Sequence, residues 1–188
     1  MNRSAFTLAE LLITLALIGV IAAMAIPATI NHVQESNYKT RLKKAIKVLN
    51  DGVSMNAASS KGTAYNYVDR NSNLSFPDYI TINIDTAEDI HNMGDGNSSF
   101  YTQDGIQYIV PNSDTGIVRC GTKGLGLGGD ENIQETDPCN IVVDVNGEQG
   151  PNMMSENETI RDRFLLKMTT NSVLPARDLE LKIYNGEI

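Results

Sequence analysis

The chain of 188 residues is poor in the side chains that enzymes and metal sites use most, since it has only two histidines and two cysteines. His32 follows a long apolar run and His91 lies in a polar stretch, and neither has a serine or cysteine beside it that suggests a nucleophile. A metal site needs more ligands than Cys120 and Cys139 supply. We therefore predict that the chain is not an enzyme and that both histidines have structural or solvent-facing roles.

The chain also has fewer basic than acidic residues, 15 against 23. Residues 61–188 hold nine basic against twenty acidic side chains, whereas residues 31–60 hold five basic against two acidic ones. A basic segment is thus followed by an acidic body. Because phosphates would be repelled by that body, nucleic acid is not an expected partner of it.

The two cysteines leave two readings open. If the body lies outside the cytoplasm, Cys120 and Cys139 are a candidate disulfide, which in the chain-entropy model contributes about 3 kcal/mol for a loop of this size. In a reducing compartment they would be two buried thiols. The sequence favours the disulfide.

Charge is absent from Leu11 to Ile30, and these twenty residues span about 30 Å as a helix, the thickness of a bilayer core. The run fits a signal peptide cleaved after Ala25, an ordinary membrane anchor, or a segment that faces lipid first and a protein assembly later. Glu10 bears on this choice, because a carboxylate at mid-membrane costs about 2.5–3.5 kcal/mol. Either Glu10 marks the aqueous edge of the span or it has a functional partner.

The stretches "AFTLAELL" and "GVIAAMAIP" resemble the N-terminus of type IV pilins and type II secretion pseudopilins. The resemblance implies that residues 1–5 are a leader, that a membrane peptidase cuts between Ala5 and Phe6, and that the new amine of Phe6 is methylated. It identifies Glu10 and Pro27 as the glutamate and the proline of the assembly helix.

The resemblance further implies a single-pass protein of the bacterial inner membrane, with its head outside the cytoplasm, that is later extracted into a filament. Its partners would be copies of itself and other pilins or pseudopilins, the prepilin peptidase, the inner-membrane assembly platform, and membrane lipid before assembly. Glu10 would pair with the N-terminal ammonium of a neighbouring subunit and so select the axial register. The alternative is a membrane-anchored minor pilin that acts as a ligand- or calcium-binding tip module.

Charge counting opposes this topology. Arg3 alone precedes the span, while five basic residues follow it, which would place the body inside the cell. The resemblance places the body outside, because cleavage requires a cytoplasmic leader. We follow the resemblance.

The helix is expected to continue beyond the span, from Phe6 to about Ser60, with a kink rather than a stop at Pro27. One apolar stripe supports this continuation. Its members are Leu42, Ile46, Leu49 and Val53. We expect four parts: a leader (1–5), a transmembrane and assembly helix (6–30), an amphipathic continuation (31–60) and a globular β head (61–188).

Six apolar runs separated by short polar gaps predict an antiparallel meander. The runs are 79–84, 105–110, 115–120, 140–145, 163–168 and 179–184. With the apolar stripe packed on this sheet, the predicted fold class is α+β and pilin-like, a long N-terminal helix whose second half packs on an antiparallel sheet.

Two predicted loops contain sequence motifs that resemble those of known binding sites. The glycine-rich stretch 124–129 lacks the strand–turn–helix context of a dinucleotide site and is interpreted as a flexible loop. The stretch "DVNGEQGPN" is either a tight turn or part of a calcium site, because its oxygens could join those of a downstream aspartate. It resembles a turn of pilin-like secretion proteins, which favours the secretion type. The candidate calcium ligands are Asp144, Asn146, Asn152 and Asp162.

Overall fold

The computed structural model divides the chain into two compact units, Met1–Asn37 and Tyr38–Ile188. It describes residues 7–59, 62–64, 75–112, 118–123, 125, 136–156 and 159–188, without the side chains of 26–29. The second unit therefore contains the last turns of the long helix together with the sheet.

Helix α1 (Leu8–Ala58) contributes to both units. Its backbone is helical on both sides of Pro27, so this proline does not end the helix. The expected end near Ser60 agrees with the structure to within two residues. The expected start at Phe6 lies outside the described residues.

The apolar stripe of α1 forms one side of the core of the second unit. All four predicted members are at most 2% exposed, and Ala45 joins them. Gly52 lies next to this stripe, where a Cβ atom would come within 2.9 Å of Ile84 Cγ1. A side chain at residue 52 would thus require the Ile84 side chain to shift.

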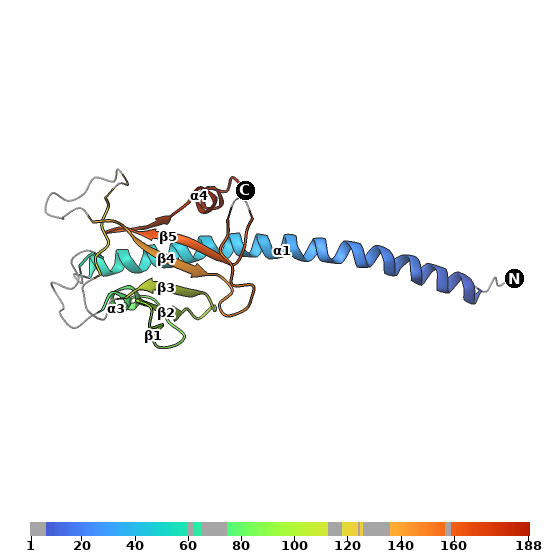
Figure 1. Cartoon of the computed structure of the whole chain (residues 1–188), viewed down its shortest axis with the longest axis horizontal. Coiled ribbons are helices and arrows are strands. Elements are labelled where there is room, and N and C mark those ends of the chain that lie inside the picture. Colours follow the sequence, from blue (N-terminus) through green and yellow to red (C-terminus); the bar gives the residue numbers. More distant parts are fainter. Residues whose placement is uncertain are drawn as a thin grey trace. The chain divides into compact units, whose positions relative to one another are not determined.

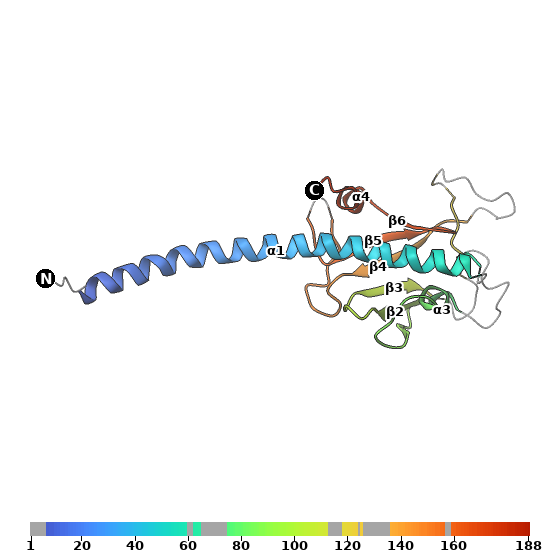
Figure 2. The ribbon, with the colours of Figure 1, turned by 180° about the vertical axis from the view of Figure 1, so that it is seen from behind.

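Within the described residues, six strands form one antiparallel sheet in chain order. They are β1 (His91–Asn92), β2 (Asn97–Tyr101), β3 (Gln107–Pro111), β4 (Cys139–Asp144), β5 (Arg163–Met168) and β6 (Val173–Pro175). Figures 1 and 2 show the second half of α1 lying against one face of this sheet. The predicted α+β class and the meander are both confirmed.

The strands bury alternate side chains against α1. In β5, Phe164, Leu166 and Met168 are all fully buried, while the residues between them are half-buried. Phe100 of β2 and Tyr108 of β3 are paired in register, and their rings stack with centroids 5.0 Å apart. Alternation of this kind is what packs one face of a sheet on a helix.

One predicted strand, 79–84, is wrong. Helix α3 (Phe76–Thr81) occupies its first half, and turns follow. The helix begins with a capping box in which the Ser75 hydroxyl accepts from the Asp78 N–H and the Asp78 carboxylate accepts from the Ser75 N–H. This cap and Pro77 at the helix start satisfy the first turn, so the apolar run forms a helix.

The predicted strand 179–184 is also wrong, because helix α4 (Asp178–Asn185) replaces it and ends at Gly186 with φ +80°. Glu180 is fully buried on α4, where its carboxylate pairs with Arg177 and accepts from the Leu165 N–H of β5 at 3.1 Å. The helix is thereby fastened to the sheet. Of the predicted strand 115–120, residues 118–120 are not in a strand and the rest lies outside the described residues.

Candidate functional site

The start of α1 is built by two side chains that the sequence places three residues apart. The Thr7 hydroxyl accepts from the Glu10 N–H at 3.3 Å, and Glu10 Oε2 accepts from the Thr7 N–H at 2.8 Å and from the Thr7 hydroxyl at 2.9 Å. This is a capping box, which satisfies two N–H groups at the helix end and places an acidic group where the helix dipole favours it.

The T-x-x-E signature was present in the sequence, and reasoning from the span alone missed it. Glu10 is therefore not a carboxylate without a partner in its own chain. Within the described residues only Oε2 of Glu10 is engaged, and Oε1 accepts no hydrogen bond from them. Ala5 and Phe6, the predicted processing residues, lie outside the described residues.

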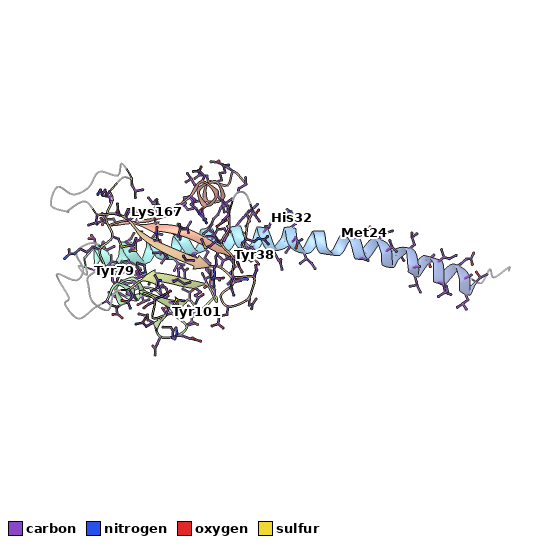
Figure 3. The ribbon with its side chains drawn as sticks, in the orientation of Figure 1. Met24, His32, Tyr38, Tyr79, Tyr101 and Lys167 are labelled. Carbon is purple, nitrogen blue, oxygen red and sulfur yellow. A yellow bond between two sulfur atoms is a disulfide. The ribbon has the colours of Figure 1, made fainter. Side chains whose placement is uncertain are left out.

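The first unit presents large apolar side chains to its surroundings. Leu12, Ile18 and Met24 are 59, 63 and 75% exposed, and their neighbours along the helix are similar (Figure 3). Thr14 interrupts this surface but donates its hydroxyl to Leu11 O at 2.9 Å, so its polar group is satisfied within the helix. Among the described residues, one helix, Leu8–Ala58, is long and apolar enough to cross a membrane.

The basic residues after the apolar run are largely matched by the second unit itself. Lys44 Nζ lies 2.7 Å from Asp104 Oδ2, and the Arg41 guanidinium donates to the main-chain oxygen of the same aspartate. Lys47 pairs with Asp51 one turn along the helix. Partial burial works to raise the pKa of Asp104, but hydrogen bonds from Lys44 and Thr102 hold it below its usual value. These cations therefore belong to a folded surface.

The loop after β4 brings all four predicted calcium ligands together. Asp144 is fully buried and its Oδ2 accepts from Arg163 Nε at 2.7 Å. Burial raises the pKa of Asp144, and the Arg163 hydrogen bond opposes that rise. Asp162 is also fully buried, and its two oxygens accept the N–H groups of Asn152 at 2.6 Å and Met153 at 2.8 Å. Both carboxylates thus already have partners inside the loop.

The two asparagines complete this loop. Asn146 donates its side-chain amide to Gly150 O at 3.2 Å, and among the described atoms its Oδ1 is buried without a partner. With its amide nitrogen turned inward, Asn152 donates to Asp144 Oδ2 at 2.9 Å and to Gly147 O at 3.1 Å. Gly147 has φ +68°, and a Cβ atom there would lie 2.8 Å from Gly105 O.

These contacts favour the tight turn over the metal site. No group of three or more His, Cys, Asp or Glu side chains in the described part of the chain is placed to hold a metal ion. The carboxylates of Asp144 and Asp162 instead hold the turn closed, one through an arginine and one through backbone N–H groups. Calcium binding stays a prediction.

Cys120 and Cys139 are joined by a disulfide. Cys120 is buried, its N–H donates to Ala64 O at 3.3 Å, and its carbonyl accepts from the Thr170 hydroxyl at 3.2 Å. Cys139 begins β4, so the disulfide fastens the start of a central strand to this buried segment.

Both histidines are exposed in the structure. His32 is exposed on α1 and His91 is exposed in β1 (Figure 3 labels His32). The glycine-rich stretch 124–129 lies outside the described residues except for Leu125.

Comparison with known proteins adds one finding. Residues 1–26 match the family model of the prokaryotic N-terminal methylation motif. No curated protein and no solved structure matches the chain. The motif is the hallmark of the prepilin-type cleavage segment of type IV pilins and pseudopilins, so the resemblance seen in the sequence is confirmed for this segment.

Proposed function

We propose that the chain is a structural subunit of a type IV pilus-like filament or a type II secretion pseudopilus, processed between Ala5 and Phe6 and assembled through its N-terminal helix. The observation that carries this proposal is the methylation motif over residues 1–26, which leads into an apolar helix with exposed side chains. An α+β head of the pilin kind follows on the same chain.

The apolar surface of the first unit requires a covering. Burying one large aliphatic side chain is worth about 1.5–3 kcal/mol, and the helix exposes such side chains from Leu8 to Val33. Lipid of the inner membrane covers them before assembly, and the helices of neighbouring subunits cover them in the filament. The same residues therefore serve two apolar surroundings in turn.

The basic residues after the span still oppose the proposed topology. Lys44 and Lys47 form ion pairs with Asp104 and Asp51, and Arg41 donates to a main-chain oxygen. The positive-inside rule counts lysines and arginines and gives acidic residues little weight, so these contacts leave the charge count unchanged. A single pass with the head outside the cytoplasm therefore rests on the cytoplasmic leader that cleavage between Ala5 and Phe6 requires.

Glu10 performs two tasks in this proposal. Its Oε2 caps the helix through Thr7, which holds the carboxylate in one position. Its Oε1 is left to accept from the methylated ammonium that cleavage creates on Phe6 of a neighbouring subunit. In a wrong axial register both charges would be buried without partners, which costs about 3–5 kcal/mol when one member of such a pair is missing.

Three substitutions in the full chain, expressed with its assembly machinery, test this role. Glu10→Ala should leave the subunit in the membrane fraction but lower the yield of sheared filaments more than about tenfold. Thr7→Val removes the capping hydroxyl and keeps the carboxylate, so it should have a smaller effect. Glu35→Gln, an exposed glutamate on the same helix, is the matched control and should assemble normally. Normal filament yield from Glu10→Ala would refute the assembly role.

A further inference from the structure

One side of the sheet of the second unit lacks basic residues. Residues 71–118, which include β1, β2 and β3, contain seven acidic side chains and no lysine or arginine. The other side, on and around β5 and α4, carries charges of both signs: residues 136–188 contain five basic and nine acidic side chains. The basic ones are Arg161, Arg163, Lys167, Arg177 and Lys182.

The acidic side ends in an exposed edge, residues 85–95, which contains β1. Four carboxylates are exposed here, and none forms an ion pair with any residue that the structure describes. They are Asp85, Glu88, Asp89 and Asp95. Met93 lies in the turn between β1 and β2 and is 44% exposed. This acidic edge thus combines unpaired negative charge with one apolar side chain at its tip.

The opposite edge of the sheet carries a groove of about 570 Å³ between α1, β6 and α4. Its floor is apolar and is formed by Ile46, Val173, Leu174, Pro175 and Tyr184. Lys43, Lys47 and Asp51 also line the groove; Lys47 is paired with Asp51, whereas Lys43 has no ion-pair partner in the described part of the chain. Tyr184 is 49% exposed, so the groove presents an aromatic surface beside a cation.

The groove cannot take a partner by strand pairing at Val173. The Asn50 side chain accepts from the Val173 N–H at 2.8 Å and donates to the Val173 carbonyl at 2.8 Å, as a neighbouring strand would. Because these two hydrogen bonds occupy the backbone N–H and C=O of Val173, an added strand cannot pair with β6 at that residue. A partner would therefore dock through side chains.

We propose that the acidic edge of one copy docks into this groove on the next copy, with Met93 against the apolar floor and Glu88 and Asp89 facing Lys43. The charges and the apolar surfaces of the two edges are complementary, and they lie at opposite ends of one sheet. Such a contact is heterologous, so it repeats from copy to copy and gives an open filament when the rotation between copies does not close a ring. This inference rests on the proposed function.

Engineered cysteines test the contact in the full chain within the assembling cell. A chain with both Lys43→Cys and Glu88→Cys should form a ladder of cross-linked multimers on a non-reducing gel, because each copy offers one end to each neighbour. The native cysteines are joined to each other and do not compete. The control pairs Lys43→Cys with Glu156→Cys, an exposed glutamate away from the acidic edge. No ladder, dimers alone, or an equal ladder from the control would overturn the proposal.

Charge reversal gives an independent measurement. One variant carries Lys43→Glu, and a second carries Glu88→Lys with Asp89→Lys. Each should reduce cross-linking between cysteines placed away from these residues about tenfold at low salt, and less at high salt. Combining the three substitutions in one chain should restore the cross-linking, which also shows that the variants fold. Failure of the combined variant to recover would contradict the proposal.

The two proposals fail in different ways. If wild-type filaments form and depend on Glu10 but yield no ladder, the edge contact is wrong and the assembly role stands. If wild-type chains form no filaments at all, the proposed function itself is wrong.

Discussion

Replacing Asp162 by asparagine should destabilise the head whether or not calcium is present. The buried carboxylate accepts two backbone N–H groups, at 2.6 and 2.8 Å. The asparagine side chain has one oxygen, so it can accept only one of the two backbone N–H groups. The second N–H would then face the amide NH2, which is itself a donor, and this unsatisfied contact costs about 1–3 kcal/mol. The remaining bond loses its charge assistance, worth about 1 kcal/mol more. The sum of about 2–4 kcal/mol corresponds to a fall in Tm of about 5–15 °C for a head of this size.

The assay is thermal unfolding of the full chain in detergent, with calcium and again with a chelator. The matched control is Glu156→Gln, an exposed glutamate in the same loop region whose substitution should change Tm by little. We expect Asp162→Asn to lower Tm equally under both conditions, because the turn is held by hydrogen bonds.

A calcium site would give another pattern. Calcium at one hundred times its Kd would stabilise the wild-type head by about 2.7 kcal/mol, and Asp162→Asn would abolish that gain. A wild-type Tm that rises with calcium, and a variant that no longer responds, would refute the hydrogen-bonded turn and support the metal site.

Three further predictions concern the head. Asn50→Ala should lower stability by about 1–3 kcal/mol in urea unfolding, because the buried Val173 N–H loses its acceptor. Gly147→Ala should cost clearly more than Gly94→Ala, since both glycines have positive φ but only the first would push a Cβ atom against a backbone oxygen. Asp104→Asn should reduce the loss of unfolding free energy that acid causes. Burial works to raise the pKa of Asp104, but hydrogen bonds from Lys44 and Thr102 lower it overall. Its ionised form therefore stabilises the head above about pH 4, and the wild type loses that contribution as pH falls further.

The strongest periodicities in the sequence predicted their elements correctly. The stripe of α1 and the alternation in 105–110 and 140–145 are long enough that only one secondary structure buries their apolar side chains together. Short runs were ambiguous. The alternation of Leu179, Leu181 and Ile183 is typical of a strand, yet burial of Leu179 and Ile183 four residues apart also fits a helix, and Gly186 ends it as one.

Other features could not be reached from sequence pattern alone. β2 is made of Asn97, Ser98, Ser99 and two aromatic residues, which have the composition of a loop, and it becomes a strand because β3 pairs with it. The partners of the calcium candidates were invisible for the same reason, since Arg163 and Asp144 meet only when β4 and β5 pair. The capping box at Thr7 could have been found, because its spacing is local.

The mass of the mature chain tests the central claim most directly. The full-length protein should be purified from cells that contain the prepilin peptidase, and its intact mass and N-terminal peptide measured with the Cys120–Cys139 disulfide reduced. The proposed function predicts a chain that begins at Phe6 and carries one methyl group on its new amine. A chain that begins after Ala25 would identify a secretory signal peptide, and a chain that keeps residues 1–5 would show that this processing does not occur; either result would contradict the proposal.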